Sequence, residues 1–192
     1  YWFFRSALLT GEASLRPLFT VDFTAERPSL PWLLALFVPA ATMRLIAEEH
    51  RDGTLEMLVT QPIRAWVVLL AKFLSGFVFV STAILATLGI PIALAFVGDL
   101  DDGAVFAQYL GVLFLAAAFV SIGLFTSSLT RNQVVAFILA LTLNALLMFI
   151  GLEVVAIALP VKLAGLLQTL SPVTHFSTIA RGIIDLRDII YF

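Results

Sequence analysis

MRLIAEEHRDGTLEMLVTQP, residues 43–62, is the strongly polar stretch between two long apolar runs of this chain. We predict that a transmembrane helix leaves the bilayer near Ile46, that residues 48–53 form a charged turn, and that residues 54–60 form a short helix. Pro62 must end this helix, because proline has no amide donor and its ring clashes with the preceding turn. The stretch therefore predicts a polar elbow between two membrane spans.

The short helix of this elbow needs a surface to lie against, because isolated helices of this length are marginal in water. Leu55, Leu58 and Val59 fall on one helical face. Glu56 lies in the first turn, where the positive end of the helix dipole favours a carboxylate. The helix is therefore expected to lie either on the membrane face or on a partner protein.

The composition is that of an integral membrane protein. Hydrophobic residues make up 61% of the chain and charged residues 12%, against roughly 25% charged residues in an average soluble domain. The mean hydropathy is +1.06. A net charge of -2 gives no electrostatic footprint for nucleic acid. The absence of cysteine from the sequence excludes disulfides, thiolate nucleophiles and cysteine-based metal sites.

The apolar runs predict an all-α, polytopic fold. The first span is short and must continue into the elbow to clear a hydrocarbon core about 30 Å thick. In the second span we expect Pro91 to kink the helix and Lys72 to extend its ammonium group to the interface. Small residues in the spans, such as Gly76 and Gly123, are explained by close helix packing. We place the spans at residues 31–47, 65–98, 105–129 and 133–159.

The rest of the chain completes one transmembrane domain, 1–192, which we expect to be a fragment of a longer protein. Residues 1–30 are the end of a preceding helix and an outer loop, and residues 48–64 are the elbow. Residues 188–192 begin another span. Residues 160–187 form two short amphipathic helices on the outer face, broken at Ser171 and Pro172, with apolar faces at Leu163, Leu166, Leu167 and Leu170 and at Phe176, Ile179, Ile183 and Leu186.

Lysine and arginine set the orientation, because the short loops that carry them stay in the cytoplasm. The elbow side has five such residues near its helix ends, whereas the turn over residues 99–103 has three aspartates and no basic residue. The elbow is therefore cytoplasmic, in a multi-pass protein of the cell (inner or plasma) membrane. The five basic residues are Arg44, Arg51, Arg64, Lys72 and Arg131.

Three candidate chemical sites have simpler explanations. Glu153 lies within an apolar run, where a carboxylate suggests a proton relay. It is also about 30 Å along the helix from residue 133, which favours a place at the outer interface. His50 and His175 lack the spacing of a metal site. The acidic turn that includes Asp99 and Asp101 is better explained as a solvated loop than as a cation site. No catalytic or metal-binding residue is predicted.

The charges of the elbow, Glu48, Glu49, Arg51 and Glu56, are either a docking surface or the solvated end of a helix. Charge alone favours the solvated end. The whole string favours docking, because a span runs directly into EEHRDGTLEMLVTQP and then into the interfacial helix start AWVVLLAKF. The sequence has no GxxxxGK[ST] motif, so any ATP that this protein uses must bind another chain.

The sequence resembles the ABC-2 type permeases, the membrane subunits of a class of ABC transporters, and within them the branch associated with gliding motility and nitrous-oxide reductase. The E-E-x-x-x-G-T-L-E string followed by a proline is the most specific part of the resemblance. The resemblance runs along nearly the whole chain. It is carried by PAATMRLIAEEHRDGTLEMLVTQPI (39–63), AKF (71–73), GLFTSSLTRNQVVAF (123–137) and RGIIDLRDIIYF (181–192).

The resemblance implies a six-helix permease, of which this chain lacks most of the first and sixth helices. It implies that two permease subunits pair with two ATP-binding subunits, that ATP and Mg bind those partners, and that the permease has no cofactor or catalytic activity of its own. A substrate would cross the membrane, most simply by export. The implied coupling residues, which contact the ATP-binding subunit, are Glu48, Glu49, Arg51, Gly53, Thr54, Leu55, Glu56 and Leu58.

Two functions of other classes compete with transport. A membrane-embedded enzyme, such as a lipid-modifying transferase, would need polar catalytic groups gathered at one depth, and the span interiors lack them. A membrane scaffold or anchor for a motility or assembly complex would keep the partner-binding elbow but would need no path through the membrane. The sequence does not predict the transported substrate.

Overall fold

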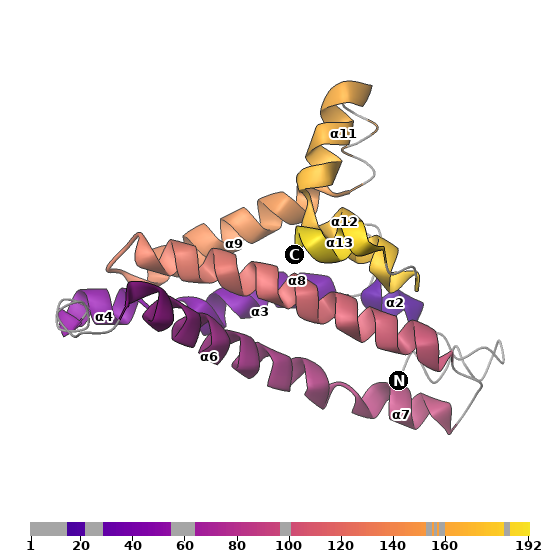
Figure 1. The fold of residues 1–192 in the computed structure, drawn as a ribbon, viewed down its shortest axis with the longest axis horizontal. Coiled ribbons are helices and arrows are strands. Elements are labelled where there is room, and N and C mark those ends of the chain that lie inside the picture. The colour runs from indigo at the N-terminus through magenta and orange to yellow at the C-terminus, as the bar shows by residue number, and fades with distance from the viewer. Residues whose placement is uncertain are drawn as a thin grey trace.

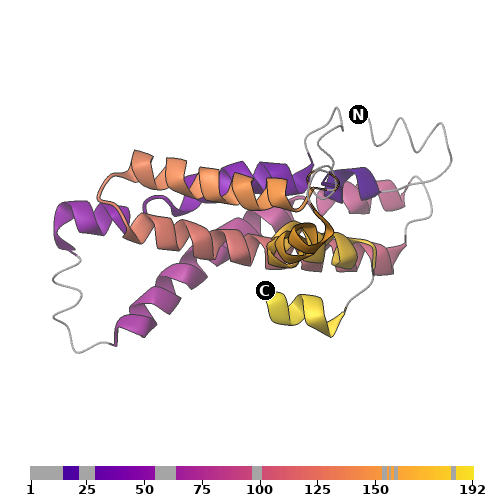
Figure 2. The same ribbon diagram turned by 90° about the horizontal axis from the view of Figure 1, so that it is seen from above.

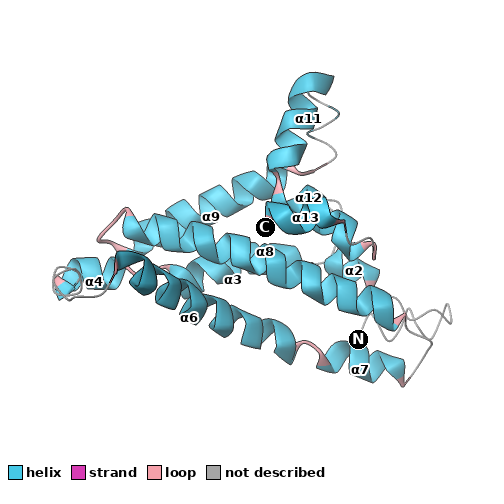
Figure 3. Cartoon of the chain, viewed as in Figure 1, coloured by secondary structure: helices cyan, strands magenta, loops and turns pink. Residues whose placement is uncertain are grey.

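The computed structural model describes residues 15–21, 29–54, 64–96, 101–152, 155, 157, 160–182 and 185–192. Within these ranges the chain is helical and has no strand (Figure 3). Four stretches are long and apolar enough to cross a membrane: Leu30–Asp52, Ala65–Ala95, Asp102–Ser128 and Gln133–Ile150. The prediction of an all-α, polytopic membrane fold is confirmed.

The first stretch consists of two helices, α3 (Leu30–Thr42) and α4 (Ala47–Asp52), with a turn over residues 43–46. The prediction that one continuous helix runs from the span into the elbow is therefore wrong, because the turn over residues 43–46 interrupts it. The predicted charged turn over 48–53 is wrong as well, since residues 48–52 are helical. Gly53, whose φ of 72° suits glycine, ends α4.

The second stretch is also interrupted. Helices α6 (Ala65–Ala86) and α7 (Gly89–Ala95) are separated at Thr87 and Leu88. Pro91 explains the position of this break, because its ring clashes with the carbonyl of Thr87, four residues earlier, and it has no amide hydrogen to donate there. The prediction that Pro91 distorts this span is confirmed.

Short polar side chains begin the next two helices. Asp101 accepts hydrogen bonds from the amides of Gly103 and Ala104, so α8 (Asp102–Ser128) starts three residues before the predicted position. Asn132 caps α9 (Gln133–Ile150) through the amide of Val134. Helix α9 ends at Ile150, whereas the predicted span continued to residue 159.

Helix α8 is the centre of the bundle and packs against α3, α6, α9 and α12 (Figures 1 and 2). Val112, Leu115 and Phe119 of α8 are fully buried. In the spanning stretches that contain α3 and α8, 50% and 56% of the apolar segment is buried. In those that contain α6 and α9, the buried share is 22%. The second and fourth spanning stretches therefore turn broad apolar faces outward, as lipid-facing helices do.

A short helix, α2 (Arg16–Phe19), lies in the segment predicted as a surface loop. Leu15, Leu18 and Phe19 belong to the buried core, and the Phe19 ring meets the edge of Tyr109 at a centroid distance of 5.3 Å. The loop prediction is wrong here, because α2 packs on α3 and its Phe19 ring contacts Tyr109 of α8.

Three short helices complete the described chain: α11 (Val161–Leu170), α12 (Pro172–Ala180) and α13 (Leu186–Tyr191). Helix α11 projects away from the bundle (Figure 1) and exposes Leu163, Leu166 and Leu170. Helix α12 instead packs on α8, with Phe176 and Ile179 buried. The break between α11 and α12 falls at Ser171, as predicted.

Candidate functional site

The turn between α3 and α4 is held by a side chain of α8. The Ser127 hydroxyl accepts hydrogen bonds from the amides of Ile46 and Ala47, at 3.1 and 3.0 Å, and donates to the carbonyl of Met43 at 3.1 Å. Ser127 is fully buried. Since a helix break leaves backbone groups unpaired, this one hydroxyl supplies the missing partners and fixes the angle at which α4 leaves α3.

A side chain of α6 holds α4 from another direction. The Lys72 ammonium donates to the Leu45 carbonyl at 2.6 Å and to Oε1 of Glu49 at 2.5 Å. The side chains of Lys72 and Glu49 are 18% and 28% exposed, so solvent screens this ion pair only in part. We call Lys72, Glu49 and the Leu45 carbonyl the Lys72 clamp. Lys72 was expected to extend to the interface, and the structure shows which groups its ammonium contacts, at the base of α4.

Glycines allow the three spans to approach each other beside this clamp. A Cβ at Gly123 of α8 would collide with the side chain of Thr42, whose own Cβ would lie only 2.7 Å away. A Cβ at Gly76 of α6 would lie 3.1 Å from Cδ1 of Leu45. The close packing predicted for Gly76 and Gly123 thus occurs at the level where α3 ends.

The opposite face of α4 is open and charged. Arg51 lies 3.9 Å from Glu48 and 3.1 Å from Asp52, and all three side chains are about half exposed. Exposed ion pairs of this kind contribute at most about 1 kcal/mol each. The face therefore offers both signs of charge to a partner and loses little stability if a partner rearranges them.

The predicted coupling residues fall into two groups. Glu48, Glu49 and Arg51 lie on α4, and Gly53 and Thr54 follow at its end, where the Thr54 hydroxyl donates to the Glu49 carbonyl at 3.4 Å. The remaining predictions, Leu55, Glu56 and Leu58, lie outside the described residues.

Sequence reasoning missed the roles of Lys72 and Ser127. The only signal for Lys72 was a lone lysine inside an apolar run. Ser127 stands among other small polar residues, and nothing in its local sequence distinguishes it.

The alternative sites do not gain support. Across the described ranges, no group of three or more His, Asp and Glu side chains lies close enough to hold a metal ion. Asp101 is occupied as the cap of α8. Glu153 and Asp99 lie outside the described residues.

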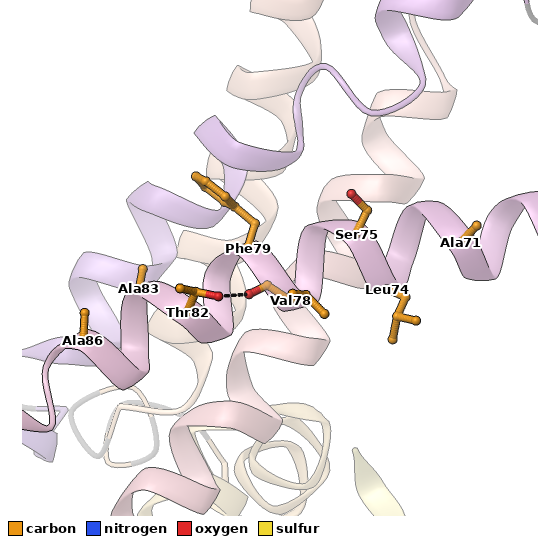
Figure 4. A pocket seen from close by; sticks show the side chains of 8 residues that line it. All are labelled: Ala71, Leu74, Ser75, Val78, Phe79, Thr82, Ala83 and Ala86. Carbon is orange, nitrogen blue, oxygen red and sulfur yellow. Dashed lines mark hydrogen bonds between the residues drawn. The ribbon is translucent and has the colours of Figure 1, made fainter.

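An open apolar groove also runs along the outward face of α6 (Figure 4). The Thr82 hydroxyl in this groove donates to the carbonyl of Val78 in its own helix, at 2.8 Å, so it is not free to bind a polar ligand as a donor. Such a surface suits lipid chains or another transmembrane helix. The residues that line it are Ala71, Leu74, Ser75, Val78, Phe79, Thr82, Ala83 and Ala86.

Comparison with known proteins gives one family. The sequence model of the family described as ABC-2 family transporter protein matches residues 20–189, a range that includes α4, Lys72 and Ser127. Neither the curated proteins nor the solved structures gave a match. With four stretches able to cross a membrane and a family match over most of its length, the chain belongs to the ABC-2 family of transporter proteins, as a multi-pass membrane component.

Proposed function

We propose that this chain is the permease subunit of an ABC transporter and that the open face of α4 docks on a separate ATP-binding subunit. The observation that carries the proposal is the two-sided environment of α4. One side is fastened to α6 by Lys72 and to α8 by Ser127, and the other side presents Glu48, Arg51 and Asp52 to solvent.

This arrangement suits the transmission of force. A partner that moves α4 would displace α6 through the Lys72 clamp, α8 through Ser127, and α3 through the chain itself. Because helices and packed interfaces deform little, the displacement would reach the interior of the membrane. ATP binding on the partner must favour one arrangement of the spans over another for this to drive transport.

The remaining parts of the proposal follow from the family. ATP and Mg bind the partner, two permease subunits pair, and the substrate passes between them, in the direction of export. The protein lies in the inner or plasma membrane with α4 in the cytoplasm, in agreement with the basic residues near α4. We place the chain in the branch associated with gliding motility and nitrous-oxide reductase on the strength of the EEHRDGTLE string.

The first test is to reverse the charge of the open face with Glu48→Lys in the full-length protein. We expect copurification with the ATP-binding subunit and substrate-stimulated ATP hydrolysis in liposomes to fall at least tenfold, while membrane insertion is unchanged. Gly53→Pro should do the same, because proline cannot adopt the φ of 72° that ends α4.

Arg187→Glu is the matched control, since it reverses an exposed charge on α13 without touching α4. It should leave both measurements unchanged. Normal ATPase binding and coupled hydrolysis in the Glu48→Lys and Gly53→Pro variants would show that α4 is not the docking element.

A further inference from the structure

A second buried polar cluster joins α11, α12 and α13. His175 of α12 lies with Nδ1 2.7 Å from Oδ1 of Asp188 and with Nε2 3.2 Å from the carbonyl oxygen of Thr169. The side chains of His175 and Asp188 are only 11% and 9% exposed. These two contacts connect the end of α11, the middle of α12 and the last helix of the described chain.

The number of protons in this cluster follows from its geometry. A carbonyl oxygen can only accept a hydrogen bond, and so can an ionised carboxylate, whereas a neutral imidazole has one donor and one acceptor nitrogen. With Asp188 ionised and His175 neutral, only one ring nitrogen carries a hydrogen. The lone pair of the other would then point at a lone pair of its contact, either Oδ1 of Asp188 or the Thr169 carbonyl oxygen. Both contacts are favourable only if His175 carries two protons, or if Asp188 carries one itself and donates it to Nδ1.

Tyr191 closes the cluster from α13. Its ring stacks on His175 at a centroid distance of 4.1 Å, and its hydroxyl donates to the carbonyl of Leu170 at 2.6 Å. A tyrosine phenol has an ordinary pKa of about 10, so the hydroxyl keeps its proton throughout the neutral range. Tyr191 therefore helps to fasten α13 without taking part in the titration.

The other described ionisable groups nearby do not compete for this proton. Arg181, Asp185 and Arg187 are exposed, and Asp185 caps α13 through the amide of Arg187. Helix α12 also packs on α8 and α9. Tyr109 is the ionisable residue of α8 beyond its first turn, and its hydroxyl pairs with Thr87. Helix α9 has no ionisable side chain. His175 thus faces Asp188 and Tyr191.

We propose that His175, Asp188 and the Thr169 carbonyl form a proton-binding latch that fastens α11 and α13 to α12. In the closed latch, the pair His175 and Asp188 shares one proton more than it has when Asp188 is ionised and His175 is neutral. Because the closed form binds more protons than the open form, its population falls as the pH rises, by up to about tenfold per pH unit. Loss of the proton turns one contact repulsive and releases α13 or the end of α11.

The bundle can sense the state of this latch. Phe176 and Ile179, one and four residues after His175 in α12, are fully buried, and α12 packs on α8. A Cβ added at Gly111 of α8 would lie 3.2 Å from Phe176 and 3.1 Å from Ile179, so α12 sits directly on the α8 backbone. The latch would make the predicted outer face responsive to the pH outside, independently of any ATP-binding partner.

Residues 1–192 contain no cysteine, so within them two introduced cysteines would be the only sites for spin labels. Leu166→Cys on α11 and Leu186→Cys on α13 place two spin labels at exposed positions. The distance between them would be measured by pulsed electron paramagnetic resonance in the full-length protein in lipid nanodiscs. As the pH is raised from about 5 to about 8, the range in which histidine is the side chain whose charge changes, we expect one short distance to be replaced by longer, broader ones.

Asp188→Asn separates proton binding from simple packing. An asparagine amide can donate to Nδ1 of a neutral His175, which still donates from Nε2 to Thr169. This variant should therefore stay closed across the whole pH range, whereas His175→Leu should be open throughout. A distance that does not depend on pH in the wild-type chain, or an Asp188→Asn variant that opens like the wild type, would overturn the proposal.

A second measurement covers the case in which the labels disturb folding. Residues 1–192 contain two histidines, and the ring resonances of His50 and His175 in the unlabelled protein give two titration curves by nuclear magnetic resonance. Asp188→Asn should change the curve of one histidine, His175, and leave the curve of His50 as it was. Two unchanged curves would contradict a proton shared between His175 and Asp188.

Discussion

The Lys72 clamp and the latch around His175 each fasten a short helix to its neighbours, at two different places in the bundle. In each, one nitrogen-bearing side chain bridges a carboxylate and a backbone carbonyl: Glu49 and Leu45 for Lys72, Asp188 and Thr169 for His175. An ammonium group has three donors whenever it is charged, whereas an imidazole has two only after it takes up a second proton. The clamp is therefore a fixed joint and the latch a conditional one.

The difference matches the roles proposed for the two regions. A helix that transmits force to the spans must not come loose when the pH changes, and α4 is fastened by an ammonium group and a buried serine. A segment that responds to its surroundings needs a joint with two states, and α13 is fastened by a histidine. The predictions below test each half of this comparison.

The largest effect is expected for Gly123→Val, at the close contact beneath the clamp. The added side chain would collide with Thr42, because even a Cβ would lie 2.7 Å from the Cβ of that residue. Overpacking of this kind costs about 3 kcal/mol. The measurement is thermal unfolding of the purified protein in detergent, with circular dichroism as the signal.

Gly165→Ala is the control for this substitution. Nothing lies within 4 Å of a Cβ at Gly165 in α11, and alanine favours a helix by roughly 0.5–1 kcal/mol over glycine. It should leave the protein as stable as before or slightly more stable. Equal stability of the Gly123→Val and Gly165→Ala variants would show that α3 and α8 do not approach as closely as described.

The second prediction concerns Ser127→Ala, which removes the partner of three backbone groups at once. Unpaired buried donors cost about 1–3 kcal/mol, and we expect about 2 kcal/mol here. Hydrogen exchange should also become faster at the amides of Ile46 and Ala47. Ser128→Ala is the matched control, since the exposed Ser128 hydroxyl bonds only to its own helix, at the carbonyl of Phe125.

The contact between Ser127 and Met43 shows the limit of prediction from the sequence. Pro91, Asp101 and Asn132 act on backbone within four residues, so the helix ends that they set are legible in the local sequence. The hydrogen bond from Ser127 to the Met43 carbonyl spans 84 residues. Only the packed bundle brings these groups together.

The same distinction explains the outcome at the candidate site. Glu48, Glu49 and Arg51 were identified because the charged string stands out from the apolar runs. Lys72 was given a general role, because a lysine near a helix end most often extends to the interface. Its partner Glu49 is 23 residues away, and the turn after α3 that exposes the Leu45 carbonyl was not predicted. The spans followed from composition, and the joints between them did not.

The third prediction concerns the energy of the Lys72 clamp. Lys72→Met leaves the Glu49 carboxylate partly buried without its partner, and we expect a loss of about 2 kcal/mol, below the cost of breaking a fully buried pair. Glu49→Gln should cost less, because the ammonium group keeps the Leu45 carbonyl. The loss of stability in the double variant should differ by about 1 kcal/mol from the sum of the losses in the two single variants.

The functional readout separates this clamp from simple packing. Lys72→Met should uncouple ATP hydrolysis from substrate while the ATP-binding subunit still copurifies, because the open face of α4 is untouched. Joint loss of binding and coupling would mean that Lys72 shapes the docking face itself rather than the connection behind it.

The smallest effect is expected for Tyr191→Phe in the latch. Phenylalanine keeps the ring that stacks on His175 and loses only the hydroxyl that donates to the Leu170 carbonyl. One such hydrogen bond contributes about 1 kcal/mol, so the ratio of closed to open latch should fall roughly fivefold at every pH. Because the proton is held by His175 and Asp188, the spin-label titration should keep the steepness of the wild type and shift to lower pH, by at most about 0.7 units for a fivefold change in the ratio. A steeper or flatter titration would show that Tyr191 takes part in proton binding, and the latch would then depend on three residues rather than on the pair that mirrors Lys72 and Glu49.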